Sequence, residues 1–524
     1  MLDVHALKAE DLQGLDPGTM ATVAAKVLAH IGSQAREIQR KDAELQFKTA
    51  KLEKITFELA RLKAWKYGAR TEAMSAEQRR LFEETLAEDE AGLEAQLRAL
   101  QGDPAPATGQ ARRKPRRQAL PEHLRRVEHR HEPEDTTCTC GRPMQRVGED
   151  VSERLDIVPA EFFVHRHVWG KWACRCCQVL VQEPVTPQII DRGMPTAGLV
   201  AHTLVSRFVD HIPYYRQEQI NARSGVHTPR STLAAWSGAG GAGLEPLFDE
   251  HRRWVLGCKV LHADETPVRL LDPGSGKTKK AYIWAYARGA FDAAPSVVYD
   301  FCLGRGSQYP VDFLANWTGT LVCDDFTGYE PVLRGADRIE AGCFAHARRK
   351  FDELFRANGS PVAAEAIRRI ALLYQIERDA RPMTPADRLA ARQQYSKGLW
   401  DDLHEWLALE RARVADGSGI AGAIDYSLNR WKALGRFLLD AEVSVDNNSL
   451  ENLMRPWAMG RKAWLFAGSE LAGQRAAVVM SLVQSAKLNG HDPWTYLKDI
   501  LQRLPEHPNR RIDELLPHRW QPGN

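Results

Sequence analysis

Three acidic side chains occur where carboxylates could converge on metal ions. Asp264 lies inside the apolar segment LHADETP, Asp324 follows Leu-Val-Cys, and Glu451 lies in DNNSLENLMRPW. A charge inside an apolar strand is costly unless it is paired or binds a metal. Three carboxylates can hold two divalent ions such as Mg2+ about 3.5–4 Å apart, where the ions stabilise the attacking and leaving oxygens of phosphoryl transfer. The sequence therefore indicates metal-dependent phosphoryl transfer on DNA.

Neighbouring acids compete for the first two places. Glu265 follows Asp264 directly, but successive residues of a strand point to opposite faces of the sheet. Asp324 and Asp325 are equivalent on spacing, and the same alternation lets only one of them face Asp264. Asp300, which ends the segment VVYD, is a weaker candidate.

Glu451 also fits a purely structural role. Asn448 precedes it by three positions, the spacing of a capping box in which the glutamate bonds the amide of the capping residue. Arg455, Arg461 and Lys462 follow on or near the same helix. Arg455 could form an ordinary ion pair with Glu451 four positions away. In the functional interpretation, the three cations contact DNA phosphates beside the acids.

Five of the nine cysteines lie in two short segments on either side of an alternating apolar stretch, RLDIVPAEFFVHRHVWGKWAC. A hairpin with a cysteine pair at each side is typical of a zinc ribbon, in which Zn2+ replaces a core too small to be stable alone. Cys176 is a competing thiolate, and His129 or His131 could substitute for one ligand. Reduced structural cysteines are the alternative. The expected ligands are Cys138, Cys140, Cys174 and Cys177.

A second ligand spacing, Cys343-x2-His346, has no evident partner pair, so we expect it to brace a strand against a helix. The net charge of +3 is informative only in its distribution. Residues 112–117 read RRKPRR, and residues 345–350 contain Arg348, Arg349 and Lys350. Such patches are typical of a phosphate-backbone partner, although solvated surface charge is an equal alternative for either patch alone.

The acids need a sheet and helices to position them. Residues 257–345 contain runs rich in Val, Tyr, Trp and Thr, which predict three strands in a meander, a helix at 308–316, a fourth strand and a fifth at Ile339–Cys343. This is the order of an RNase H-like sheet. Residues 352–440 are predicted to be helical, with Trp400, Trp406 and Trp431 in the core, and residues 446–500 are helical again.

The N-terminal part predicts interaction modules. Apolar residues recur every seven positions from Ile31 to Leu59, which favours a short coiled coil over an ordinary amphipathic helix. Within 195–245, a helix, a turn and a second helix opened by Thr228-Pro229-Arg230 suggest a helix-turn-helix that contacts DNA, or a plain packing unit. No apolar run is long enough for a membrane span, and the N-terminus is no signal peptide, so we expect the reducing cytoplasm.

Taken together, these segments resemble the transposases of the insertion sequence 66 family. The resemblance covers nearly the whole chain, in order. It runs through WKYGARTE, LFEE, GEDVSERLDIVPAEFFVHRHVWGKWACRCC, YYRQEQINARSGVHTPRSTLAAW, LHADETPVRLL, LVCDDFTGY, GCFAHARRKF, DNNSLENLMRPWAMGRKAWLFAGSE and NGHDPWTYLKDIL.

The resemblance implies a DDE transposase with Asp264, Asp324 and Glu451 as its acids, which decides for Asp324 over Asp325 and raises Glu451 above its capping role. It implies two catalytic Mg2+ or Mn2+ ions and a structural Zn2+. Asn452 is a departure, because the family often carries Arg there. The implied partners are terminal inverted repeats, target DNA, further copies of the chain and accessory transposition proteins, in a bacterial cytoplasm at the nucleoid. A DNA-binding protein that no longer cuts and a structure-selective nuclease are the alternatives.

The expected fold class is α/β, with an RNase H-like mixed sheet interrupted by a large helical insertion. The expected segments are a helical coiled-coil leader at 1–101, a basic flexible linker at 102–122, a zinc-finger-like module at 123–186, a helix-turn-helix-like segment at 187–250, the first part of the catalytic core at 251–351, the insertion at 352–440 and the rest of the core at 441–524.

Overall fold

The computed structural model describes residues 120–523 apart from 121, 123, 159–160, 191–192, 273–276, 336 and 465–466, together with scattered positions between Gly32 and Leu97. The chain divides into two compact units, Met1–Gly68 with Gln96–Gln110, and Ala69–Ala95 with Ala111–Asn524. The described positions between Gly32 and Leu97 are helical. Residues 112–117 and Ile31 lie outside the described residues.

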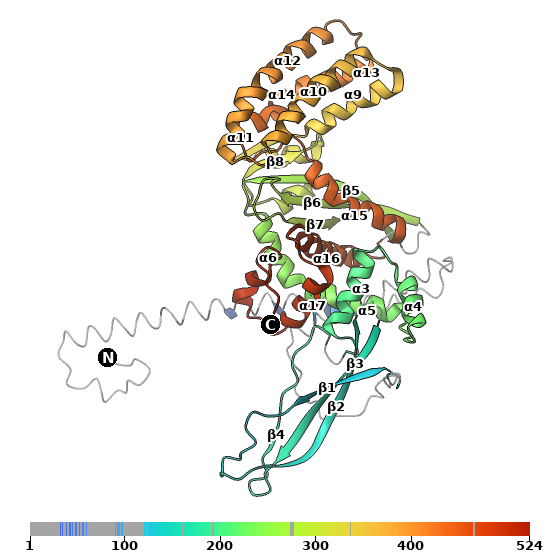
Figure 1. Cartoon of the computed structure of the whole chain (residues 1–524), viewed down its shortest axis with the longest axis vertical. Helices are drawn as coiled ribbons and strands as arrows, with labels where there is room; N and C mark the ends of the chain where they lie inside the picture. The colour runs from blue at the N-terminus through green and yellow to red at the C-terminus, as the bar shows by residue number, and fades with distance from the viewer. Residues whose placement is uncertain are drawn as a thin grey trace, which may run out of the picture. The chain divides into compact units, whose positions relative to one another are not determined.

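A five-stranded mixed sheet forms the centre of the second unit (Figure 1). Its order is β7-β6-β5-β8-β9, with β5, β6 and β7 antiparallel and with β8 and β9 parallel to β5. The alternating and aromatic runs of the sequence suit a pleated surface that is packed on both faces. The strands are β5 Val260–Asp272, β6 Lys277–Arg288, β7 Val297–Cys302, β8 Gly319–Cys323 and β9 Arg338–Gly342.

Helices cover both faces of this sheet. α15 (Asn448–Trp464) contacts β5, and α16 (Glu470–Leu488) covers the edge strand β7. The hydroxyls of Ser485 and Ser481 on α16 accept hydrogen bonds from the amides of Val297 (3.0 Å) and Tyr299 (2.8 Å). These bonds occupy amide groups of β7 that an exposed edge strand would leave unpaired. The elements near the other face are α7 Gln308–Phe313, η3 Thr327–Tyr329 and α8 Glu330–Leu333.

A helical block lies between β9 and α15 in the sequence, and its helices gather into one bundle (Figure 1). The hydroxyls of Ser360 and Thr384 cap α10 and α11, each followed by proline in the first turn. Trp400 is buried and stacks on Trp431 at 4.0 Å, as the sequence predicts. The elements are α9 Phe344–Asn358, α10 Pro361–Ala380, α11 Pro385–Ala391, η4 Arg392–Ser396, α12 Lys397–Arg411, α13 Gly419–Asn429, α14 Trp431–Leu434 and η5 Gly435–Leu438.

A second set of helices packs against α16. α3 contacts α17 and α5, and α5 also contacts α16. None of the described helices combines the length and the apolar character needed to cross a bilayer. The elements are α3 Ala197–Phe208, α4 Tyr214–Arg223, α5 Arg230–Gly243, α6 Glu245–Val255, α17 Pro493–Arg503 and η6 Asn509–Leu515.

The cysteine region forms a four-stranded sheet built on a long hairpin of β2 (Gln145–Val158) and β3 (Glu161–Ala173). β1 (Arg125–His131) runs parallel to β3, and β4 (Leu180–Gln182) pairs with the end of β3. The hairpin is predicted by the sequence, but the parallel strand β1 is not. The structure confirms the predicted α/β class, with a mixed sheet and a helical block.

Candidate functional site

Asp264 and Asp324 are placed by the parallel pairing of β5 and β8. His262 lies opposite Val322 at the end of the paired register. Continuing this register by two positions brings Asp264 opposite Asp324, which directly follows β8. Residues directly opposite in adjacent strands have side chains on the same face. The two carboxylates therefore belong to one face of the sheet.

The surroundings of Asp264 are acidic. Burial and the negative charges of Glu265, Asp324 and Glu451 raise the pKa of Asp264 to about 7. Its Oδ1 accepts a hydrogen bond from the amide of Glu265 at 2.8 Å, and no Lys or Arg in the described part of the chain forms an ion pair with it. A buried carboxylate among like charges, with no cationic partner of its own, suits a divalent-metal ligand. Among the described residues, however, the ligand atoms of Asp264, Asp324 and Glu451 do not all lie within 4.8 Å of one another.

The competing acid Glu265 has ion-pair and hydrogen-bond partners of its own. Its side chain is 2% exposed, and it accepts hydrogen bonds from Arg305 Nε at 2.7 Å and from the Tyr329 hydroxyl at 3.0 Å. Glu265 lies opposite Trp284 in the sheet register, whereas Asp264 lies opposite Ala285. The predicted alternation of the two side chains is thus present.

Asp325 and Asp300 are also engaged elsewhere. Asp325 pairs with Arg430 at the end of α13. Asp300 lies opposite Trp284, on the face of the sheet away from Asp264, and accepts a hydrogen bond from the Cys302 thiol at 3.2 Å. Neither carboxylate joins Asp264 and Asp324.

Glu451 lies in the first turn of α15 and does not form a capping box. The helix begins at Asn448, whose amide donates to Asp446 Oδ1 at 3.1 Å. The Glu451 carboxylate instead meets Arg349 Nη2 at 3.4 Å and His346 Nδ1 at 3.9 Å. The capping-box alternative is therefore wrong. These two contacts replace the alternative ion pair between Glu451 and Arg455.

Asn447, which the sequence did not single out, fastens the start of α15 to the sheet. Its Nδ2 donates to the carbonyl of Ala263 at 2.9 Å, and its Oδ1 accepts from His262 Nδ1 at 2.7 Å. Its backbone amide donates to Cys343 Sγ at 3.2 Å. Asn447 is 1% exposed. One buried amide thus ties the helix of Glu451 to the strand of Asp264, and only its place before a helix could have pointed to it.

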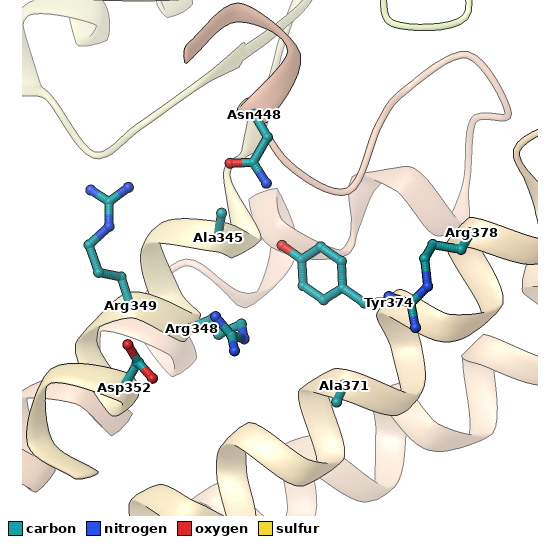
Figure 2. Close-up of a pocket in the computed structure, with 8 residues that line it drawn as sticks. All are labelled: Ala345, Arg348, Arg349, Asp352, Ala371, Tyr374, Arg378 and Asn448. Atoms are coloured by element: carbon teal, nitrogen blue, oxygen red, sulfur yellow. The ribbon is translucent and has the colours of Figure 1, made fainter. Parts of the chain in front are cut away.

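A basic hollow of about 430 Å3 lies beside these groups. Arg348 and Arg349 enter it from α9, Tyr374 and Arg378 from α10, and Asn448 from the start of α15 (Figure 2). The Tyr374 hydroxyl lies beside the Asp446 carboxylate, and burial raises its pKa. The hollow is also lined by Ala345, Asp352 and Ala371.

The remaining predicted DNA contacts differ in accessibility. Arg455 and Lys462 are exposed on α15. Arg461 donates to the carbonyl of Pro267 at 2.8 Å and so fastens α15 to β5. Lys350 lies over the ring of Tyr426, with Nζ 4.5 Å from its centroid.

The helix-turn-helix expectation needs correction for α5. The helix is buried from Leu233 to Ala242 except at Ala235, so it cannot lie in a DNA groove along its length. A Cβ at Gly240 would come within 2.8 Å of Val200, which shows how closely α5 packs on α3. Arg230 remains at the first turn, 3.5 Å from Glu218. The exposed surface belongs mainly to α4.

The four predicted zinc ligands form one cluster. Their sulfur atoms all lie within 4.8 Å of one another, and Cys140 Sγ is 3.9 Å from Cys174 Sγ. A left-handed residue follows each pair, Gly141 (φ 78°) and Gln178 (φ 52°), and turns the chain around the sulfurs. Cys176 is outside the cluster. The alternative ligands His129 and His131 bond instead to His165 and His167 on β3.

Models of known protein families match most of the chain. A family model described as Transposase IS66 family matches residues 192–475, more than half of the sequence. The chain belongs to the IS66 transposase family. Two further IS66 family models match the chain. The IS66 C-terminal element matches residues 481–518, and the zinc-finger binding domain of transposase IS66 matches residues 135–178. Residues 54–128 match a domain described as Transposase C of IS166 homeodomain.

Two relatives from Sinorhizobium fredii (strain NBRC 101917 / NGR234) illustrate the extent of the likeness. Uncharacterized protein y4hP is 36% identical over 434 residues, 78% of each chain. Uncharacterized protein y4qI is 34% identical over 537 residues, which cover 99% of this chain and 97% of the relative.

The range of the principal IS66 model includes the three acids, Asp264, Asp324 and Glu451, and also the helical block between β9 and α15. The block is therefore part of the IS66 architecture. The IS66 zinc-finger range includes all four clustered cysteines, and this cluster fits zinc binding.

Proposed function

We propose that this IS66 transposase acts by a DDE mechanism, with Asp264, Asp324 and Glu451 as the metal-binding acids. The observation that carries the proposal is the joint placement of these acids. The β5–β8 register puts Asp264 and Asp324 on one face, and Asn447 ties the helix of Glu451 to the residue before Asp264. All three negative charges are close enough for two of them to raise the pKa of the third.

The catalytic core is proposed to be RNase H-like. A meander of three antiparallel strands followed by two parallel strands, in the order β7-β6-β5-β8-β9, supports this assignment. The segment boundaries predicted from the sequence are part of the same proposal. Residues 251–351 and 441–524 would then supply the core, and 352–440 an insertion within it.

Two Mg2+ or Mn2+ ions bound by the three acids would activate water and stabilise the leaving oxygen. The residues of the chain supply the rest. Asp264 and Asp324 place negative charge at the sheet face, and the Asn447 tether fixes the approach of Glu451. Water would attack a phosphodiester phosphorus at each end of the element, and the bond from phosphorus to the 3′ oxygen would break, which leaves a 3′-OH and a 5′-phosphate. At the same site, each 3′-OH would then attack a phosphorus of the target DNA and displace the target's 3′ oxygen as a new 3′-OH. No protein side chain needs to bond covalently to DNA in this scheme.

Cations around the acids are proposed to hold the phosphates of the flanking DNA. Arg348, Arg349 and Arg378 line the basic hollow beside Asn448, and Arg455 and Lys462 are exposed on α15. Arginine suits this role because its planar fork matches the oxygens of a phosphate. The hollow thus marks the path of a phosphate backbone next to Glu451.

The N-terminal modules are proposed to recognise terminal inverted repeats and to pair copies of the chain. The zinc-finger module and α4, with the first turn of α5 around Arg230, would read the repeats. Ile38 and Leu45, which lie one heptad apart in the leader helix, are 59% and 60% exposed. This exposed part of the seam favours pairing with a second copy, whereas Leu59 of the same seam is 6% exposed. Accessory transposition proteins complete the proposed set of partners.

The decisive test is strand cleavage by Asp264→Ala on a labelled DNA duplex that carries the element's inverted repeat, with Mg2+ present. We expect cleavage to fall by roughly 10³-fold or more, because a metal-binding acid is lost, while affinity for the repeat changes by less than about twofold. Asp325→Asn is the matched control and should cut normally. Full cleavage by Asp264→Ala would overturn the assignment, and cutting without any strand-transfer product would indicate a nuclease.

A further inference from the structure

Cys343, His346 and Glu451 form a second cluster of metal-ligand type. The Cys343 sulfur, the His346 Nδ1 and a Glu451 carboxylate oxygen all lie within 4.8 Å of one another. Apart from the four zinc-finger cysteines, it is the one such group in the described part of the chain. The sequence shows the Cys-x2-His half of it, and the Glu451 partner comes from more than a hundred residues further along the chain.

Two helix starts hold the three side chains together. Cys343 precedes α9, and His346 lies in its first turn, while Glu451 lies in the first turn of α15. The Phe344 amide donates to the Val445 carbonyl at 3.1 Å, which joins the two segments just before their helices begin. The two segments that carry the three side chains are thus held together by a backbone contact.

Polar atoms in this cluster lack hydrogen-bond partners. His346 Nδ1 and Glu451 Oε1 are buried, face each other at 3.9 Å, and form no hydrogen bond within the described residues. Buried polar atoms without partners are rare and call for an unseen ion or water. Cys343 is completely buried, which raises the pKa of its thiol, and its sulfur accepts a hydrogen bond from the Asn447 amide at 3.2 Å. The thiolate would therefore form together with the bound ion, because metal binding deprotonates a coordinating thiol.

The donor set indicates which ion fits. Thiolate and imidazole ligands select Zn2+ over the harder Mg2+. Zinc bonds of about 2.0–2.3 Å place tetrahedral ligands roughly 3.3–3.8 Å apart, slightly closer than the separations here. Three protein ligands leave a fourth position open, as in zinc sites that bind water or substrate.

We propose that Cys343, His346 and Glu451 bind a zinc ion with an open fourth position, beside the Asp264–Asp324 pair. The binding itself stands on the cluster alone, whereas its catalytic meaning rests on the proposed function. Within that function, this zinc ion takes the place of one of the two Mg2+ or Mn2+ ions, and the other ion binds Asp264 and Asp324.

The test is the zinc content of the full chain after saturation with Zn2+ and gel filtration. We expect about two zinc ions per wild-type chain, one in the zinc-finger cysteines and one here. Cys343→Ser and His346→Gln should each retain about one, and Cys140→Ser combined with His346→Gln should retain almost none. Replacement by Co2+ should give a thiolate charge-transfer band that decreases in His346→Gln without loss of the zinc-finger spectrum.

Matched controls separate ligation from folding. Cys323→Ser removes another buried thiol of the same sheet, and His404→Gln removes a partly buried histidine of α12, so both should keep two zinc ions. His346→Gln keeps the test valid if Cys343→Ser fails to fold. One zinc ion in the wild type, lost on Cys140→Ser, would overturn the proposal. Asp264→Ala should keep both ions while losing cleavage, so the two proposals fail independently.

Discussion

Adjacent acids in β5 show how environment separates residues of the same type. Glu265 is buried against Arg305 and Tyr329, so its charge has partners. Asp264, one position earlier, is surrounded by Glu265, Asp324 and Glu451. A carboxylate left among like charges destabilises the fold until a cation binds. Burial and these like charges therefore disfavour the ionised form of Asp264, and in the proposed function bound metal ions would relieve that cost.

Asp264→Asn should stabilise the metal-free protein at alkaline pH. The pKa of Asp264 is raised from 3.8 to about 7, so the wild-type fold loses stability as pH rises from about 4 to about 7 and then stays constant. At pH 8 in EDTA, we expect the variant to be more stable by up to about 4 kcal/mol, a Tm increase of several degrees. Thermal unfolding between pH 5 and pH 8 measures the difference, which should shrink toward pH 5.

Asp325→Asn is the control for that experiment. The Asp325 carboxylate is 54% exposed and pairs with Arg430, so this substitution should not raise the Tm under the same conditions. Addition of Mg2+ should raise the Tm of the wild type more than that of Asp264→Asn. An Asp264→Asn variant that is no more stable than the wild type in EDTA at pH 8 would contradict a destabilising effect of the ionised Asp264.

The sequence pointed to candidate acids of the sheet but not to their surroundings. Asp264 could be predicted because a charge inside an apolar strand is locally anomalous. Glu451 could not be separated from a capping residue, since its contacts with Arg349 and His346 come from another helix. Asn447 was missed for the same reason, because its partners His262 and Ala263 lie in a distant strand.

At the scale of elements, α15 is fastened to β5 at both ends. Asn447 binds Ala263 before the helix begins, and Arg461 donates to the Pro267 carbonyl near its end. Beyond the helix, Ala467 exchanges backbone hydrogen bonds with β5, donating to Arg269 at 2.7 Å and accepting from Leu271 at 2.8 Å. Repeated attachment to the same strand holds Glu451 at a fixed position over the sheet.

Asn447→Ala should lower both stability and cleavage. The change removes the buried partner of His262 Nδ1 and the side-chain bond to the Ala263 carbonyl, which costs about 1–3 kcal/mol. Denaturant unfolding measures the stability, and a labelled-duplex assay measures the cleavage rate. Asn448→Ala, at the exposed neighbouring position, is the control and should change stability by less than about 0.5 kcal/mol. Equal effects of the two substitutions would refute the tether.

Element types followed from the sequence where local pattern decides them. The strands β5 to β9 match the predicted apolar runs closely. β1 was missed, because RRVEHRH is polar and gains its pairing only from β3. The role given to α5 was wrong, because its small residues RSTLAAWSGAGGAG serve close packing against α3 and α16. Periodicity alone does not distinguish a groove-binding helix from a buried one.

For the whole molecule, the basic hollow joins the helical block to the catalytic region. Arg378 on α10 lines the same cavity as Arg348 on α9 and Asn448 on α15. The block thus contributes charge to the proposed DNA path as well as a hydrophobic core. A block that only filled the space between β9 and α15 would not be expected to place an arginine in this cavity.

Arg348→Ala combined with Arg378→Ala should weaken DNA binding uniformly across sequences. Each lost phosphate contact should reduce the slope of log affinity against log salt concentration by about 0.9. Anisotropy titrations with labelled duplex at several salt concentrations measure this slope. Arg368→Ala is the control, because Arg368 lies on the same helix but pairs with Glu365 at 2.7 Å. An unchanged slope in the double variant would exclude the hollow from the DNA path.

The position of the helical block also sets the order in which the molecule can mature. The hydrogen bond between His262 and Asn447 joins residues 185 positions apart, so it closes only after the block between them has been synthesised. Domains fold as units during synthesis, at about 5–20 residues per second. A nascent chain that ends before α15 carries two aspartates, no third acid and uncapped amides on β7. The proposed metal site can therefore be assembled only after the helical block and the start of α15 have been synthesised.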